Sequence, residues 1–165
     1  MNYSQDCYDL AAESEGCILR AYDDARPDHI LQPGDTVMGA LTIGRGHTGP
    51  DVHIGLEWTQ EQANAQLAAD LQVHCEQMNS VVKVPLTQGQ TDALTDFTYE
   101  EGIDRLRKST LLILLNGRQY SQVPGQLYRV DNNGDQHGYI FAGGKILPGL
   151  ITRRQKEIEL WNKTA

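Results

Sequence analysis

The chain has 165 residues, 39% of them hydrophobic, and a formal net charge of −8. Its length favours one domain with a core large enough to fold without disulfides. Its acidic balance argues against binding to nucleic acid or to an anionic membrane surface. The longest apolar run covers only residues 111–115, far short of a membrane span. The N-terminal residues lack the basic and apolar regions of a signal peptide, so we expect synthesis in the cytoplasm.

The first predicted helix covers residues 4–14, with Ser4 as a typical N-cap. Its apolar face is formed at helical spacing by Cys7, Leu10 and Ala11. Gly16 suits the left-handed position that often follows a helix end. Residues 17–58 then change character, because short apolar runs alternate with Gly, Pro and Asp, and Pro33-Gly34 is a strong turn signal. This pattern predicts a small, twisted antiparallel β lobe with long loops.

Helical patterns resume at Thr59. Thr59 and Gln62 have the spacing of a capping box, and the following apolar periodicity predicts a helix to about Asn79. Thr87 and Gln90 form a second such box, opening a helix that should stop at Gly102. Further short helices are expected over 109–116, ended by Gly117, and from Pro148 onward. The predicted fold class is therefore α+β.

The cysteines and histidines give no sign of a metal site. Cys7, Cys17 and Cys75 form no C-x-x-C motif, and an odd number without an export signal predicts free thiols. The histidines show no ligand spacing, so we expect no metal and no cofactor.

Two carboxyl groups near the N-terminus are candidates for acid–base chemistry. Glu15 follows the first predicted helix, where the negative end of the helix dipole disfavours ionisation, the direction that a general acid requires. Asp24 lies in the β lobe. Thr42 begins a predicted strand, and its side-chain hydroxyl could orient a water molecule. Glycoside hydrolysis commonly uses two such carboxyl groups. Spacing alone favours two ordinary solvated carboxylates. Asp23 directly precedes Asp24 and is a second candidate for its role. Neighbouring strand residues point to opposite faces, so only one of the two can face the cleft.

Two longer motifs carry a resemblance to a known family. They are Glu15-Gly16-x-x-Leu19-Arg20-Ala21-Tyr22-x-Asp24 and Leu41-Thr42-Ile43-Gly44-x-Gly46-His47-Thr48-Gly49. Weaker matches follow in order, among them Pro85-Leu86-Thr87-Gln88, Ala142-Gly143-Gly144-Lys145 and Arg153-Arg154. Together they cover roughly residues 10–161 and resemble the phage lysozymes.

The resemblance implies a lysozyme-like fold for one domain over residues 1–165. A small antiparallel β lobe at about 16–58 would be joined by a long linking helix, about 59–79, to an all-helical lobe. That lobe would cover about 80–165 and include the N-terminal helix.

The resemblance also implies a muramidase that cleaves the β-1,4 bond between N-acetylmuramic acid and N-acetylglucosamine of peptidoglycan. Glu15 would be the general acid, Asp24 the second carboxylate and Thr42 the water-positioning hydroxyl. We expect a monomer without stable membrane association, made in the cytoplasm of a bacterial host and acting in the periplasm or cell wall after release. Two alternatives stay open: a lytic transglycosylase, and an inactive lysozyme-fold module that binds the wall.

The family pattern suggests supporting roles for further residues. The candidates for substrate binding are Thr48, Tyr99, Glu100 and Thr110. His47 is expected to pair with Asp70 on the linking helix and brace the two lobes, the alternative being a partly exposed loop histidine. Arg153 and Arg154 are expected to reach toward the helix that carries the catalytic Glu, the alternative being a solvated basic face.

Three features need separate readings. Gly44-x-Gly46-x-x-Gly49 matches a dinucleotide-binding fingerprint, but no helical pattern follows, so we interpret these glycines as permitting a tight turn. Residues 131–135 resemble the start of a calcium loop but lack its later ligands, so we predict a polar turn followed by a strand over 139–141. The segment 25–41 is longer than in many relatives and should extend the β lobe or a rim loop.

Overall fold

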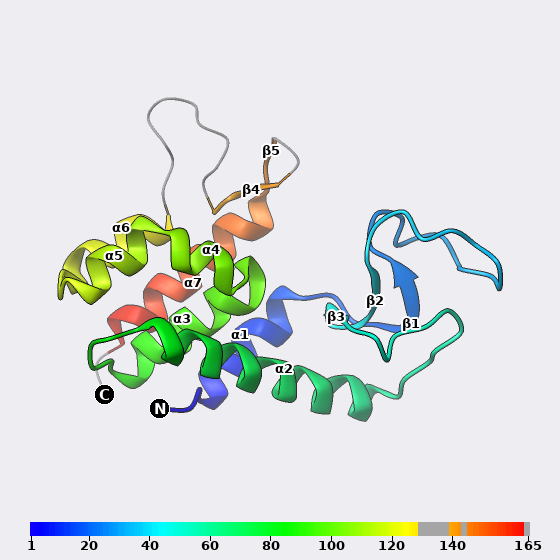
Figure 1. Ribbon diagram of the computed structural model, residues 1–165, viewed down its shortest axis with the longest axis horizontal. Helices are drawn as coiled ribbons and strands as arrows, with labels where there is room; N and C mark the ends of the chain where they lie inside the picture. The colour runs from blue at the N-terminus through cyan, green and yellow to red at the C-terminus, as the bar shows by residue number, and fades with distance from the viewer. Residues whose placement is uncertain (129–138, 143–144, 164–165) are drawn as a thin grey trace. The chain divides into compact units, whose positions relative to one another are not determined.

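The computed structural model describes residues 1–128, 139–142 and 145–163 (Figure 1). The chain divides into two compact units. One unit is Glu15–Asp70, and the other combines Met1–Ser14 with Leu71–Ala165. The boundary falls within the long helix α2 (Gln60–Val81). That the whole chain acts as a single domain stays a prediction.

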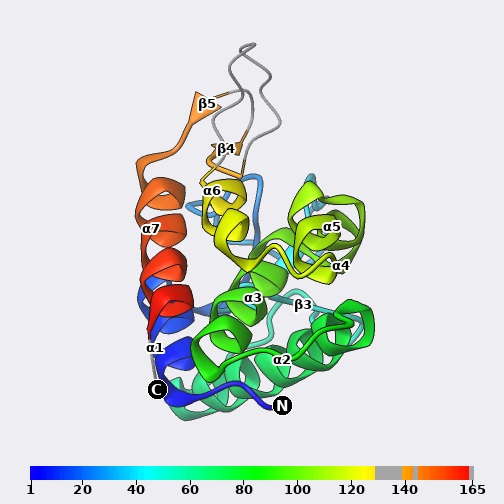
Figure 2. The same cartoon turned by 90° about the vertical axis from the view of Figure 1, so that its left-hand side faces the viewer.

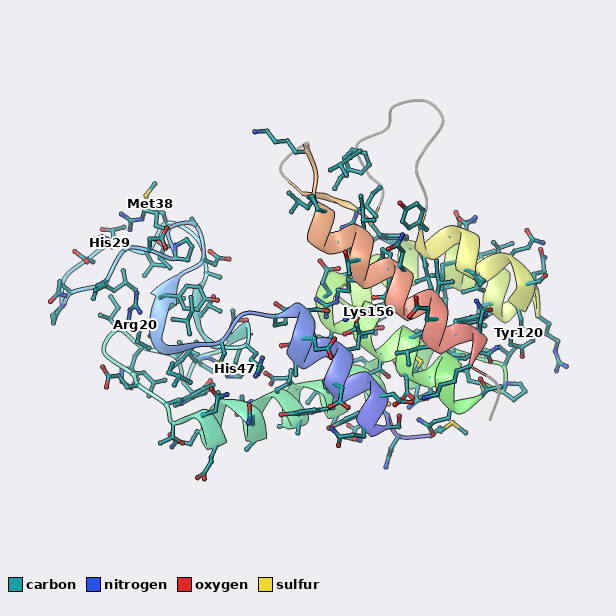
Figure 3. The ribbon with its side chains drawn as sticks, turned by 180° about the vertical axis from the view of Figure 1, so that it is seen from behind. Arg20, His29, Met38, His47, Tyr120 and Lys156 are labelled. Atoms are coloured by element: carbon teal, nitrogen blue, oxygen red, sulfur yellow. The ribbon has the colours of Figure 1, made fainter. Side chains whose placement is uncertain are left out.

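The Glu15–Asp70 unit is built on a small antiparallel sheet of order β1-β2-β3. Its strands are β1 (Ile18–Asp23), β2 (Leu41–Gly44) and β3 (His47–Thr48). The buried residues Ala21, Ile43 and Val52 form a small core, and Trp58 packs against it. After β3 the chain returns to β1, where Arg20, labelled in Figure 3, forms an isolated antiparallel bridge with Glu57. The predicted β lobe and α+β class are confirmed.

Glycines make the turn between β2 and β3 possible. Gly44 and Gly46 have φ angles of 68° and 96°, in the left-handed region that other residues rarely adopt. A Cβ atom on Gly44 would lie 2.9 Å from the Trp58 ring. Gly44 and Gly46 of the dinucleotide-like motif therefore serve a tight turn, as predicted, and Gly44 also allows a close approach to the Trp58 ring.

The other unit is helical and includes a short hairpin. Its elements besides the second half of α2 are α1 (Gln5–Ser14), α3 (Gln88–Glu101), α4 (Ile103–Lys108), α5 (Thr110–Asn116), η1 (Tyr120–Gln122), α6 (Val123–Leu127), β4 (Phe141–Ala142), β5 (Lys145–Ile146) and α7 (Pro148–Asn162). Figure 2 shows α3 in the middle of these helices, where it packs against α7 and α1. Its residues from Thr91 to Thr98 are all buried, so α3 is the central element of this core.

The predicted helix boundaries are largely confirmed, because they depend on local caps. Thr59 and Gln62 make both hydrogen bonds of their capping box, at 2.8 and 3.2 Å. The second box, Thr87 with Gln90, is also complete. Helix α3 ends before Gly102, whose φ is 81°, as the sequence predicts.

Three sequence expectations differ from the structure or lie outside it. Gly16 does not adopt the expected left-handed conformation. The guanidinium of Arg45 instead donates to the Glu15 carbonyl oxygen at 3.3 Å, so a side chain satisfies this carbonyl just past the helix end. The predicted polar turn at 131–135 lies outside the described residues. Of the strand predicted over 139–141, only Phe141 lies in a strand, β4, which pairs with β5, while Tyr139 and Ile140 lie in a turn. Within the described part of the chain, no helix is long and apolar enough to cross a membrane.

Candidate active site

Glu15 directly follows α1 and is half-buried. Its main chain is tied to the β2–β3 turn by the Arg45 hydrogen bond. The bond fixes the Glu15 backbone relative to the sheet, since both residues belong to the same compact unit. The backbone of the candidate acid is therefore held to the β2–β3 turn of its own unit.

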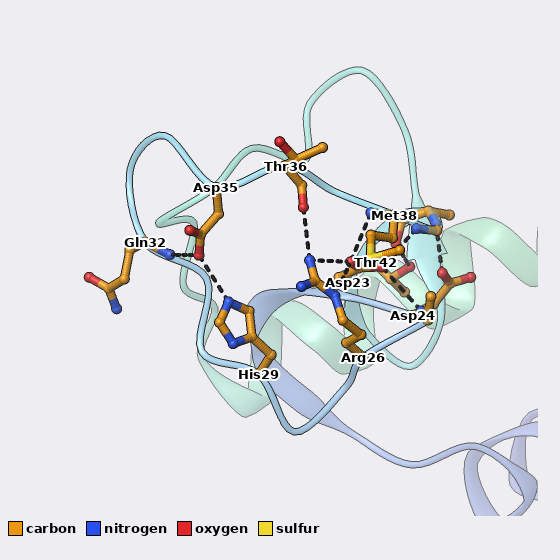
Figure 4. Close-up of polar contacts among 12 residues, drawn as sticks. Asp23, Asp24, Arg26, His29, Gln32, Asp35, Thr36, Met38 and Thr42 are labelled. Atoms are coloured by element: carbon orange, nitrogen blue, oxygen red, sulfur yellow. Dashed lines mark hydrogen bonds and ion pairs between the residues drawn. The ribbon is translucent and has the colours of Figure 1, made fainter.

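The structure separates Asp23 from Asp24. Asp23 ends β1 and is fully buried, with 0% of its surface exposed. Its carboxylate accepts hydrogen bonds from the main chain of Ala25, Met38 and Gly39 and from the Arg26 side chain (Figure 4). The Met38 amide, followed by these other donors, lowers the pKa of Asp23 to about 2 despite its burial. Asp24 is exposed, and its Oδ1 accepts a single described hydrogen bond, from the Ala40 amide at 2.6 Å.

One face of the sheet carries the remaining candidates in a row. Tyr22 on β1 is the register partner of Thr42 on β2, and Thr42 is the partner of Thr48 on β3. Paired residues of antiparallel strands lie on the same face, and so do residues two apart on one strand. Tyr22, Thr42 and Thr48 therefore share one face and Asp23 belongs to the opposite one, while Asp24 follows β1 in a turn, where its carboxylate accepts from the Ala40 amide. The Thr42 hydroxyl donates to the Ala40 carbonyl at 3.1 Å.

Tyr22 connects this face to Glu15. Burial raises the pKa of the Tyr22 hydroxyl, and the negative charges of Glu15 and Asp24 raise it further. Both carboxylates are thus within electrostatic reach of the same phenol. Glu15 and Asp24 lie just before and just after β1. Two carboxyl groups near one another are suited to acid–base chemistry on one bond.

His47 lies between two carboxylates next to this row. Its Nδ1 is 2.9 Å from Asp70 on α2, and its Nε2 is 3.3 Å from Asp51. The imidazole also packs against the Trp58 ring, with the ring centres 5.5 Å apart. The structure thus places the predicted pair of His47 and Asp70 in contact. The contact ties the sheet to the first half of α2, within one compact unit.

The other three candidates for substrate binding belong to the helical unit. Tyr99 is half-buried at the end of α3 and packs edge-on against His74, with the ring centres 5.4 Å apart. Glu100 has 21% of its side chain exposed and forms an ion pair with Arg154 at 3.2 Å. Thr110 is exposed as the first residue of α5. Tyr99 and Glu100 thus have structural partners, while the Thr110 side chain is accessible.

Arg153 and Arg154 do not form a solvated basic face. Arg153 makes two hydrogen bonds to the Asp96 carboxylate, at 2.8 and 2.9 Å, and both residues are buried. The fully buried Arg154 forms ion pairs with Glu100 and Glu101 of α3 and with its own helix neighbour Glu157. The described ion pairs of both arginines run to α3 or stay within α7, and the Arg153 charge also lies within electrostatic reach of Cys7 on α1.

These buried charges alter the ionisation of two carboxyl groups. Burial and the neighbouring carboxylate of Glu100 raise the pKa of Glu101 to about 8. Burial also raises the pKa of Glu157 well above its usual range. Within residues 1–128, 139–142 and 145–163, no three His, Cys, Asp or Glu side chains are arranged to hold a metal ion.

Comparison with protein families decides the assignment. The family model described as phage lysozyme matches residues 12–157. The chain belongs to the phage lysozyme family. This lysozyme-family chain is 31% identical to the endolysin of Bacillus phage B103 over 98% of its own length, but it spans only 54% of that relative. It is also 34% identical to the SAR-endolysin of Escherichia phage Mu, over 79% of this chain and 70% of the relative.

Solved structures support a lysozyme-like fold. The muramidase domain of SpmX from Asticaccaulis excentricus matches with a TM-score of 0.74 and 27% identity, over 99% of both chains. The endolysin of Escherichia coli O157:H7 phage FAHEc1 matches with a TM-score of 0.73 and 28% identity, over 98% of this chain and 94% of that one. The predicted fold class is therefore confirmed.

Sequence reasoning missed two groups of residues around these sites. Tyr22 lies within the quoted motif, and its place two residues before Asp24 on a predicted strand was an available signal. The partners of the two arginines, Asp96 and Glu157, had no such signal. Asp96 lies in a different helix, distant in sequence, and Glu157 sits at a position where a charged residue normally faces solvent.

Proposed function

We propose that this chain hydrolyses bacterial peptidoglycan at the β-1,4 bond between N-acetylmuramic acid and N-acetylglucosamine. The observation that carries the proposal is that Glu15 and Asp24 both lie within electrostatic reach of Tyr22, the register partner of Thr42, and that the Ala40 peptide holds both Asp24 and the Thr42 hydroxyl. Membership of the phage lysozyme family and the lysozyme-like fold support a glycoside hydrolase that acts on peptidoglycan. The endolysin and muramidase names of the relatives point to the same substrate class.

In the proposed mechanism, Glu15 donates a proton to the oxygen of the scissile glycosidic bond. Asp24 stabilises the developing positive charge or activates water, and Thr42 orients that water. Asp24 suits this role better than Asp23, because the Asp23 carboxylate is buried and fully occupied by donors. An exposed carboxylate with one amide donor remains accessible to a sugar.

Four residues are proposed to contact the sugars. Thr48 is exposed next to Thr42 and could bond sugar substituents beside the scissile bond. Tyr99 offers an aromatic surface on which a sugar ring can pack, and Thr110 and Glu100 offer polar groups. His47 and Asp70 would support the site by fixing β3 to α2. We propose that the chain acts as a monomer on peptidoglycan in the periplasm or cell wall, after release from the cytoplasm of a bacterial host.

The test is the release of soluble fragments from purified peptidoglycan by wild type, Glu15→Gln and Glu13→Gln. Glu13 is a matched control, since it is an exposed glutamate paired with Lys156 only two residues earlier. We expect Glu15→Gln to lose at least about 100-fold in rate, as removal of a general acid does, and Glu13→Gln to keep wild-type activity.

Two results would contradict the proposal. Equal rates for wild type and Glu15→Gln would remove the catalytic role of Glu15, and binding to the wall without cleavage would indicate an inactive module. The products decide the reaction type. Hydrolysis leaves reducing N-acetylmuramic acid ends, whereas 1,6-anhydro ends would identify a lytic transglycosylase.

A further inference from the structure

Asp23, the neighbour of the proposed catalytic Asp24, has hydrogen-bond donors for both of its carboxylate oxygens. Asp23 accepts five hydrogen bonds, at 2.9 to 3.1 Å, although none of its surface is exposed. Two of these donors are the main-chain amides of Met38 and Gly39, which are distant in sequence. A carboxylate removed from water is stable only when donors replace its hydration, and here they do. Asp23 thus joins the two ends of the segment 25–39 at one point.

The rest of that segment is organised by separate contacts farther from the sheet. Arg26, which also binds Asp23, donates to the Thr36 carbonyl at 2.8 Å (Figure 4). Asp35 accepts from the Gln32 amide at 2.8 Å and lies 3.0 Å from the His29 ring. The loop therefore has a base held by Asp23 and an outer part held by Asp35. The printed hydrogen bonds of the two carboxylates have no donor in common.

Ala40 directly follows Gly39 at the base of the loop, and its peptide groups bind both Asp24 and Thr42. The Ala40 amide donates to Asp24 Oδ1 at 2.6 Å. The Ala40 carbonyl accepts both the Asp24 amide and the Thr42 hydroxyl, each at 3.1 Å. One peptide residue thus sets the carboxylate and the hydroxyl together. Its place follows from that of Gly39, whose amide Asp23 holds.

Gly39 must also lack a side chain. A Cβ atom at this position would lie 1.9 Å from Asp24 Oδ1 and 2.9 Å from the Ala25 amide nitrogen. Such distances are far below van der Waals contact, so a methyl group here would displace the Asp24 carboxylate. The φ of Gly39 is not in the left-handed region, so the backbone itself accepts alanine. The requirement for glycine at 39 comes from the space that Asp24 occupies.

We propose that Asp23 is a positioning residue for the reaction proposed above. It acts through the main chain of residues 38–40, which sets the Asp24 carboxylate and the Thr42 hydroxyl. The two adjacent aspartates divide the work: Asp24 faces the substrate, and Asp23 fixes the backbone that aims it. The inference rests on the proposed function, because positioning has a kinetic meaning only if Asp24 takes part in cleavage.

The first test is Asp23→Asn, which keeps the shape of the side chain but replaces one acceptor oxygen with a donor. Asparagine has one acceptor oxygen and cannot accept the five hydrogen bonds that the two carboxylate oxygens share, so residues 38–40 should shift. We expect kcat on solubilised glycan strands to fall about 10- to 100-fold with KM nearly unchanged, as for a displacement of up to about 1 Å. Asp35→Asn is the matched control in the same loop and should keep wild-type kcat.

A double-mutant cycle separates positioning from a general loss of structure. Since Asp23 acts partly through Asp24, the losses of Asp23→Asn and Asp24→Asn should not multiply. The double variant should therefore lose clearly less in kcat than the product of the two single losses, the remainder reflecting the displaced Thr42 hydroxyl. Multiplied losses in the double variant would overturn the proposal, and so would equal losses in the Asp23→Asn and Asp35→Asn variants.

Gly39→Ala carries the test if Asp23→Asn fails to fold. We expect it to lose at least tenfold in kcat, while Gly149→Ala, whose added Cβ meets no atom within 4 Å, stays at wild-type activity. A wild-type kcat for a folded Gly39→Ala variant would overturn the proposal. Failure of the function itself looks different, because wild type and Glu15→Gln would then both be inactive.

Discussion

Replacement of Asp96 with asparagine tests whether a buried ion pair holds α7 against α3. Asp96 and Arg153 have 0% and 4% of their side chains exposed, and two hydrogen bonds of 2.8 and 2.9 Å join them. The asparagine variant keeps the volume but removes the charged acceptor of two hydrogen bonds from the buried Arg153 guanidinium. Since α3 is the central helix of the unit, loss of the ion pair should lower the stability of the whole helical unit.

The expected magnitude follows from the burial of both partners. Removing one member of a fully buried ion pair costs about 3 to 5 kcal/mol, because the remaining charge keeps its desolvation penalty. For a chain of this size, each kcal/mol lowers the melting temperature by about 2 to 4 °C. Asp96→Asn should therefore lower Tm by about 6 to 20 °C.

The assay can follow the helical unit alone. Trp161 is buried in its core, and Trp58 belongs to the other unit, so in a Trp58→Phe background the fluorescence reports on Trp161. Asp104→Asn is the matched control, since Asp104 pairs with Arg107 at 3.2 Å on the surface with 78% of its side chain exposed. Exposed pairs contribute about 0 to 1 kcal/mol. Equal small losses in both variants would refute the reasoning from burial.

Two further predictions concern ionisation and packing. Folding raises the pKa of Glu101 to about 8 and that of Glu157 well above its usual range, so the folded chain keeps protons that the unfolded chain releases. The free energy of unfolding, measured with urea, should therefore fall as the pH rises from about 5 to about 8. It should fall less for Glu157→Gln, and the same pH dependence in this variant as in wild type would contradict the reasoning. Gly44→Ala should destabilise the sheet by at least about 1 kcal/mol, because its φ is 68° and its Cβ would lie 2.9 Å from Trp58. Gly125→Ala, in open space within α6, is the control, and equal stability of the two variants would refute the clash.

The sequence alone determined the features that depend on neighbouring residues. Both capping boxes, the end of α3 at Gly102 and the Pro33-Gly34 turn involve groups within about four positions of one another. The order of short motifs along the chain was enough to predict the lysozyme-like fold, which the comparisons confirm. The catalytic candidates came from the same motifs, and their roles stay proposals. At Gly16 local reasoning failed, because a side chain from the distant β2–β3 turn supplied the hydrogen bond instead.

Only the tertiary structure distinguishes the surroundings of Asp23 from those of Asp24. The two residues are chemically identical, and what separates them is the return of Met38 and Gly39 to one side of β1. The same holds for Arg153, whose buried partner Asp96 lies on another helix, so that a side chain typical of a solvated face became part of a core. The burial of Asp23 and of Arg153 depends on contacts with residues far apart in sequence, which no local pattern of residues encodes.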